Sequence, residues 1–166
     1  MNFNFLSPVS DLVLAHNELL SQQALGRKLR IHSKHKGIPD LEGVSIVLLG
    51  VLENRNDQNY IGEEFQLNEI RKSFYSLFPG SWNTVIADLG DINRGESVED
   101  TYFALKTTIA ILIKKNIIPI IIGGTQDLTY SNYRAYDTIM PMVNIVNVDC
   151  KFDLGDSTKP IKNDRI

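Results

Sequence analysis

Short apolar runs alternate with longer amphipathic segments through most of the chain. The runs at residues 44–51, 84–89, 117–122 and 143–148 contain few polar side chains, and each is too short for an independent helix. Runs without apolar–polar alternation are typical of strands that are buried on both faces of a parallel sheet. We therefore predict four parallel strands. The last two deliver polar loops to one rim of the sheet, where open α/β folds place their functional residues.

Amphipathic segments fill the intervals between these strands, with apolar residues at three- and four-residue spacing. Helices are expected over about residues 8–30, 62–78, 97–115 and 126–139. Ser97 and Asp100 form a capping-box pattern at the start of the third helix. The alternation of strand and helix with short connections is typical of a parallel sheet with helices on its faces.

The chain of 166 residues fits a single domain. We divide it into an N-terminal helical extension over residues 1–43, an α/β core over residues 44–154 and a polar tail over residues 155–166. An open sheet of four parallel strands would leave a long edge unpaired. We therefore expect either the remainder of a longer chain or a second copy in a homo-oligomer to cover that edge.

Composition and charge exclude several classes of partner. The net charge is −3 at pH 7 with both signs mixed along the chain, so we expect neither a nucleic acid nor an anionic membrane surface as a partner. No apolar run approaches the roughly 20 residues that span a membrane. The single cysteine, Cys150, favours a reducing compartment, and the N-terminus lacks a signal-peptide pattern. These features predict a cytoplasmic protein.

Three motifs follow the predicted strands in a fixed order: D-L-G-D, then G-G-T-Q-D, then D-C-K-F-D. In order and spacing they resemble the ureohydrolase family of arginases, agmatinases and formimidoylglutamases, where the corresponding motifs are D-L-G-D, G-G-D-H-S and D-A-H-x-D. The resemblance implies a three-layer α/β/α arginase-like fold with a parallel sheet. It also implies a two-manganese site at the carboxyl ends of the strands, where a metal-bridging hydroxide hydrolyses a guanidino or formimino group.

When the family's metal-ligand positions are matched one by one, this sequence keeps only some of the ligands. Asp149 and Asp153 match the two aspartates of D-A-H-x-D. Gln126 stands where the family has a metal-binding histidine, and Lys151 stands where it has a second histidine. The family's remaining ligands come from a later S-x-D-x-D segment, which we expect to lie beyond the part of the protein represented here.

Three further side chains are expected close to these positions without binding a metal themselves. Thr125 and Asp127 flank Gln126 and take the places of an aspartate and a serine in the family motif. Asp156 follows Asp153 in the polar tail. The resemblance implies that these three residues support the ligand positions.

The substitutions at the ligand positions disfavour a metal centre. A glutamine carbonyl is a weaker ligand than imidazole for a divalent transition metal, and a protonated lysine has no lone pair to donate. Two metal ions about 3.5–4 Å apart also need several anionic ligands to offset their repulsion. We therefore predict no cofactor for this chain, with Lys151 as the counter-ion of Asp149 and Asp153. Dinuclear Mn²⁺ is expected only if the family's site is functional.

Two functions remain open. The first is a catalytically inactive ureohydrolase-family protein with a structural, regulatory or partner-binding role. The second is a manganese-dependent hydrolase of a small guanidino or formimino substrate, of the formimidoylglutamase or agmatinase type, represented here by its N-terminal half. In the second case Asp149 and Asp153 would bind metal, and Gln126 would be an auxiliary ligand or a substrate contact.

Three other features have both a functional and a structural interpretation. Gly123 and Gly124 before a helix could hold a phosphate, but a tight turn inherited from the fold is the favoured interpretation. His32 and His35 have a metal-binding spacing, yet they lie in a basic segment where solvated side chains are expected. The polar loop at residues 53–60 is either a ligand contact or an ordinary surface loop.

Overall fold

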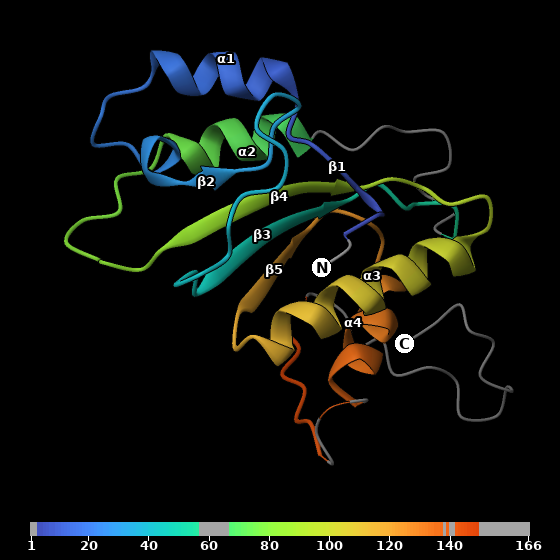
Figure 1. The fold of residues 1–166 in the computed structure, drawn as a ribbon. Helices are drawn as coiled ribbons and strands as arrows, with labels where there is room; N and C mark the ends of the chain where they lie inside the picture. The colour runs from blue at the N-terminus through green and yellow to red at the C-terminus, as the bar shows by residue number, and fades with distance from the viewer. Residues whose placement is uncertain (1–2, 57–66, 138, 140–141, 150–166) are drawn as a thin grey trace, which may run out of the picture.

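The computed structural model describes residues 3–56, 67–137, 139 and 142–149. Its sheet lies between two pairs of helices, with α1 and α2 on one face and α3 and α4 on the other (Figure 1). The helices are α1 (Asp11–Leu19), α2 (Leu67–Tyr75), α3 (Val98–Lys114) and α4 (Leu128–Asp137), with a short 3₁₀ helix η1 (Leu25–Lys28). The predicted three-layer α/β/α arrangement is therefore present. None of the helices in the described residues is long and apolar enough to cross a membrane.

The centre of the sheet is parallel, and its order is β1-β4-β3-β5 with β2 also pairing with β4. The strands are β1 (Leu6–Ser7), β2 (Arg30–Ile31), β3 (Ile46–Val51), β4 (Ile86–Ile92) and β5 (Ile118–Ile122). β3 pairs in parallel with both β4 and β5, whereas β1 pairs antiparallel with β4. The wholly parallel sheet predicted from the sequence is thus corrected to a mixed one.

Strand alternation divides the core between the two helical layers. Val47 and Leu49 of β3 are fully buried against Leu105 and Ile109 of α3. Leu48 points to the opposite face and packs with α1 and α2. Successive side chains of a strand point to opposite faces, so burial of all three confirms that β3 is covered on both sides.

β5 is the edge of the described sheet, and the expectation that residues 117–122 are buried on both faces is wrong. Ile118 is 61% exposed and Ile120 is 42% exposed. The predicted strand at 143–148 is also wrong, since residues 142–149 form neither helix nor strand and Val148 is 95% exposed. An apolar run becomes a strand only when a neighbouring strand supplies hydrogen bonds, and here the run does not pair with β5.

The N-terminal segment differs from the single helix predicted over residues 8–30. Helix α1 ends at Leu19, after which the chain forms η1 and then β2, which pairs with β4.

The predicted capping box at the start of the third helix is present in α3. The Ser97 hydroxyl accepts a hydrogen bond from the Asp100 amide (3.1 Å), and the Asp100 carboxylate accepts one from the Ser97 amide (2.8 Å).

Candidate functional site

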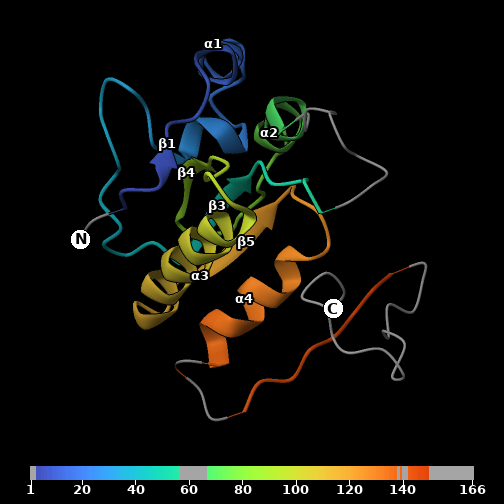
Figure 2. The same ribbon diagram turned by 90° about the vertical axis from the view of Figure 1, so that its right-hand side faces the viewer.

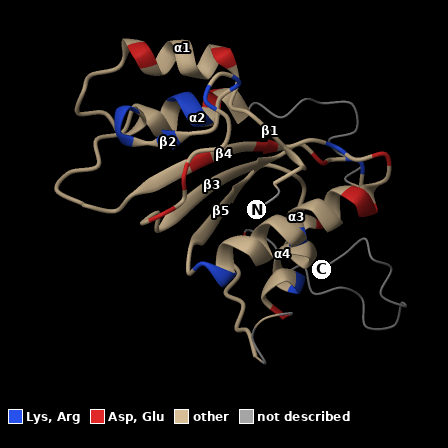
Figure 3. Ribbon diagram, viewed as in Figure 1, with Lys and Arg blue, Asp and Glu red and all other residues tan. Residues whose placement is uncertain are grey.

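The parallel strands β3, β4 and β5 all end at one edge of the sheet, which we call the rim. Figure 2 views the molecule from the side on which β3 and β4 end. The segments that follow these strands carry Glu53 and Arg55 after β3, Arg94 after β4, and Thr125 and Asp127 after β5. Acidic and basic residues are interspersed over the described ribbon, without a layer of one sign (Figure 3). Polar loops therefore converge at this edge after β3, β4 and β5. The prediction that a strand at residues 143–148 delivers one of these loops is wrong, because those residues form no strand.

Glu53 is a fully buried carboxylate at the rim. Arg55 donates to it from Nη2 (2.6 Å) and Nε (2.9 Å), and the Thr101 hydroxyl donates to Oε2 (2.8 Å). Burial alone would raise the pKa of Glu53, but the hydrogen bonds and charge of Arg55, together with Thr101, outweigh it and lower the pKa to about 2. Glu53 is thus a paired, permanently ionised group at neutral pH.

The same residues connect the β3 loop to α3 and to the β5 turn. Arg55 also donates to the carbonyl oxygens of Glu96 (2.9 Å) and Ser97 (3.0 Å) at the start of α3. The Thr125 amide donates to the Glu53 carbonyl oxygen (3.1 Å). Glu53 and Arg55 therefore hold three chain segments together, a role for the polar loop that the sequence left undecided.

Asp127 forms a second cluster beside the first. It is buried and accepts hydrogen bonds from the hydroxyls of Tyr102 and Thr125 and from Asn56 Nδ2 (3.3 Å). Burial and the neighbouring Asp127 both raise the pKa of Tyr102, so the phenol remains a protonated donor. The acceptor oxygens of Asp127 are consequently engaged by internal donors.

The glycine turn after β5 positions Thr125 and Asp127. Gly123 and Gly124 have φ values of +77° and +75°, in the left-handed region that side chains other than glycine rarely adopt. A Cβ atom on Gly124 would also lie 1.8 Å from Leu128 Cδ1. This geometry supports the interpretation of the two glycines as a tight strand-to-helix turn.

The structure brings Gln126 and Asp149 together. Both are exposed, and Gln126 Nε2 donates to Asp149 Oδ2 over 3.4 Å. Thr125 and Asp127 lie buried beside Gln126. The remaining predicted site residues, Lys151, Asp153 and Asp156, lie outside the described residues, as does Cys150.

A buried ion-pair network between α2 and β4 was not predicted from the sequence. Arg71 of α2 is fully buried and donates to Asp88 from Nε (2.8 Å), to Asp91 from Nη1 (2.7 Å) and to the Gly90 carbonyl oxygen (2.9 Å). The Tyr75 hydroxyl donates to the same Asp88 carboxylate (2.8 Å). The two acids are those of the D-L-G-D motif, so here this motif anchors α2 to β4.

Helix α2 buries a different face from the one that its apolar residues indicate. Ile70 and Leu77, at helical spacing from Leu67, are exposed, and the buried residues of α2 are Leu67, Arg71 and Tyr75. A spacing of four residues links these three positions, so the pattern was present in the sequence with a cation at its centre. Apolar periodicity does not reveal this pattern, because an arginine does not count as a core residue.

Electrostatics agree with a structural role for this network. Burial would lower the pKa of Arg71, but Asp88 and Asp91 outweigh it and raise that pKa further above its ordinary value. Burial raises the pKa of Tyr75, and the Asp88 charge raises it further. Burial also raises the pKa of Asp91, against the opposing effect of Arg71. Arg71 and Tyr75 therefore act as fixed donors.

Comparison with known proteins identifies the family of this chain. The sequence model of the arginase family matches residues 44–165. The chain belongs to the arginase family. The agmatine ureohydrolase of Thermoplasma volcanium has a similar structure, with a TM-score of 0.50 and 18% sequence identity. The similarity covers 74% of this chain and 41% of that chain, and at this identity it supports the arginase-like fold alone. No curated protein sequence matches this chain.

The arginase family implies a dinuclear manganese centre, which needs a cluster of imidazole and carboxylate ligands. No group of three or more His, Cys, Asp or Glu residues in the described ranges could hold a metal ion. Of the implied ligand positions, the described ones supply an amide, Gln126, and one carboxylate, Asp149. These two donors alone are too few for a pair of divalent metals, which needs several anionic ligands, and the implied positions Lys151 and Asp153 lie outside the described residues.

Replacing Tyr102 with phenylalanine is expected to lower the free energy of unfolding by about 1–2 kcal/mol, because the buried Asp127 carboxyl group loses a donor. Equilibrium unfolding in urea measures the change. The substitution Tyr133→Phe on α4 is the matched control, for which we expect less than about 0.5 kcal/mol. Equal losses in the two variants would contradict the importance of the Tyr102–Asp127 hydrogen bond.

Proposed function

We propose that this chain, in the form described, is a catalytically inactive arginase-family protein that acts through a structural or partner-binding role. The observation that supports this most directly is that Asp127, in the loop after β5, is engaged by hydrogen-bond donors from three parts of the protein. Asp127 accepts from Tyr102, Thr125 and Asn56, and Thr125 is buried in the same cluster. Groups engaged in this way are poorly placed to orient metal ligands or a substrate.

The ligand positions support the same proposal. Gln126 replaces the imidazole that the family motif implies, and its Nε2 donates toward Asp149 Oδ2 over 3.4 Å. An amide N–H pointing at a carboxylate occupies the side from which a cation would approach. We further propose Lys151 as a counter-ion for Asp149 and Asp153, which would reduce the need of these carboxylates for a metal.

The alternative is a manganese-dependent hydrolase of which this chain forms the N-terminal part. It is favoured by the proximity of Gln126 and Asp149 at the rim and by the fact that the chain spans 41% of the length of the agmatine ureohydrolase. Agmatine or another small guanidino or formimino compound would then be the substrate. Asp149 and Asp153 would bind metal, and Thr125, Asp127 and Asp156 would support them.

A partner is a natural part of either proposal. β5 is the edge strand of the described sheet, and its residues Ile118 and Ile120 are exposed. An unpaired strand with apolar side chains is a template for another strand. We propose that a second copy of this chain or the remainder of a longer one covers this edge. The single cysteine supports a reducing, cytoplasmic compartment.

Manganese titration of the purified chain separates the two functions. We expect no saturable binding by calorimetry up to about 1 mM Mn²⁺, since only weak ligands replace the two imidazoles. We also expect no urea, ammonia or formamide from agmatine, arginine or formiminoglutamate. The double substitution Gln126→His and Lys151→His is expected to produce weak Mn²⁺ binding.

Two bound manganese ions per chain, together with release of urea, ammonia or formamide, would refute the inactive role. Metal binding without hydrolysis would also refute the proposed salt-bridged ligand positions. A wild-type protein that binds manganese no more strongly than an Asp149→Asn variant would agree with the proposal.

A further inference from the structure

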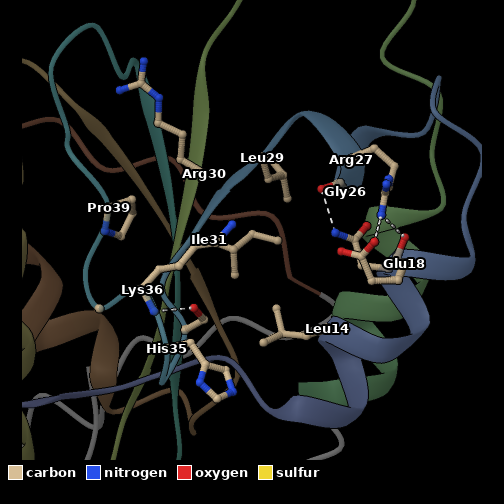
Figure 4. Close-up of a pocket in the computed structure, with 13 residues that line it drawn as sticks. Leu14, Glu18, Gly26, Arg27, Leu29, Arg30, Ile31, His35, Lys36 and Pro39 are labelled. Carbon is tan, nitrogen blue, oxygen red and sulfur yellow. Dashed lines mark hydrogen bonds and ion pairs between the residues drawn. The ribbon is translucent and has the colours of Figure 1, made fainter.

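A cavity of about 580 Å³ lies away from the rim, between α1, η1, β2 and the loop that follows β2 (Figure 4). Its apolar wall is formed by Leu14, Leu29, Ile31 and Pro39. None of the residues of the Glu53, Asp127 or Arg71 clusters lines it. A volume of this order accommodates a small organic molecule.

The cavity is positively charged in a protein whose net charge is −3. Arg27, Arg30 and Lys36 line it together with His35, and Glu18 is the acidic residue among the lining side chains. Arg27 pairs with Glu18. In Figure 4, Arg27 and Glu18 lie on one side of the cavity, and His35 and Lys36 lie on the other. The excess of positive charge favours an anionic ligand.

The loop that carries His35 and Lys36 is held by hydrogen bonds. The backbone groups of Ser33 and Gly37 pair with each other, with a distance of 2.8 Å from the Gly37 amide to the Ser33 carbonyl oxygen. The Lys36 amide donates to Ser33 Oγ (3.2 Å), and Arg30 Nη1 donates to the carbonyl oxygen of Asp40 (2.9 Å). The exposed side chains of His35 and Lys36 therefore project from a preorganised turn, which reduces the entropic cost of binding a ligand.

We propose that this cavity binds a small organic anion with a compact apolar body. The carboxylate or phosphate would pair with His35 and Lys36, and the body would contact Leu14, Leu29 and Ile31. This binding site is independent of the proposed role of the rim.

Calorimetric titration with matched probes tests each part of the proposal. The probes are benzoate and phenyl phosphate, which distinguish the two anionic groups, with acetate lacking the apolar body and benzyl alcohol lacking the charge. We expect at least one aromatic anion to bind with one-to-one stoichiometry and a Kd of about 0.1–1 mM. Acetate and the neutral alcohol are each expected to bind about tenfold more weakly.

Substitutions at exposed positions locate the binding. The double variant His35→Gln and Lys36→Gln is expected to weaken binding of the preferred anion about tenfold, because the charged partners are lost. Lys115→Gln at the end of α3 removes the same lysine charge at an exposed position elsewhere and is expected to bind like the wild type. Amide resonances of Gly26 and Gly37 should shift on titration, while those of Gly123 and Gly124 should not.

Failure of both aromatic anions to bind at 10 times the expected Kd would overturn the proposal. So would binding that the His35 and Lys36 substitutions leave unchanged, or resonance shifts confined to the rim. Equal affinities for benzoate and acetate would also overturn it, because the apolar wall would then make no contact with the ligand.

Discussion

Replacing Arg71 with methionine is expected to lower the free energy of unfolding by about 3–5 kcal/mol. Arg71 is fully buried and pairs with Asp88, itself fully buried, and with Asp91. Methionine fills a similar volume but leaves two carboxylates without their cation, and an unpaired buried charge is far more costly than the loss of an exposed ion pair. Urea unfolding followed by circular dichroism measures the difference.

The neighbouring substitution Lys72→Met is the matched control for Arg71. Lys72 pairs with Glu69 on the same helix, at a more exposed position, and its loss should change stability by less than about 0.5 kcal/mol. Combining Arg71→Met with Asp88→Asn should cost less than the sum of the single substitutions, by about 1–3 kcal/mol, because the two residues act as a pair. Strict additivity would show that Arg71 contributes through its volume rather than its charge.

Replacing Glu53 with glutamine is expected to destabilise the protein by about 2–3 kcal/mol at pH 7. The fully buried Glu53 carboxylate accepts from Arg55 and Thr101, and its folded-state pKa of about 2 lies below the ordinary value of 4.5. Glutamine retains the shape but removes the charge and turns one acceptor oxygen into a donor, which then faces other donors.

The effect of Glu53 on stability depends on pH in a defined direction. Above about pH 5 the carboxylate is ionised in both the folded and unfolded states, and its contribution is complete. Below pH 4.5 the unfolded state binds a proton that the folded state does not, so the contribution falls until the pH approaches 2. The stability gap between wild type and Glu53→Gln should therefore narrow by about 2 kcal/mol between pH 6 and pH 3.

Urea unfolding at several pH values measures that gap, with Glu42→Gln as the control at an exposed position. The control should differ from the wild type by less than about 0.5 kcal/mol at every pH. A gap between wild type and Glu53→Gln that is independent of pH would show that the Glu53 carboxylate is not preferentially ionised in the folded protein.

Part of the candidate site could be predicted from local order in the sequence. The Gly123–Gly124 turn and the clustering of polar residues after β3 and β5 follow from short-range signals: glycines after an apolar run, and polar residues where strands end. The partners of Glu53 could not be predicted. Thr101 lies 48 positions away from Glu53, and no periodicity connects a loop residue with one on a distant helix.

The D-L-G-D motif illustrates the same limit within one strand. Leu48 of β3 pairs with Asp88, but Gly50 pairs with Asp91, so β4 contains one extra residue at this point. Asp88 and Asp91 would face opposite sides of a regular strand, and the bulge turns both toward Arg71. Gly50 leaves room for this, since a Cβ atom there would lie 1.9 Å from Asp91 Oδ1.

The sequence by itself determined the strands β3 and β4, the capped helix α3 and the arginase-family relationship, because each depends on residues close together in the chain. The tertiary structure alone decided the pairing of β1 and β2 with β4, the exposure of residues 143–148 and the burial of Arg71. These features depend on contacts between distant segments. Ordering such segments costs chain entropy, so whether they form depends on which hydrogen-bonding and charged partners the folded protein supplies.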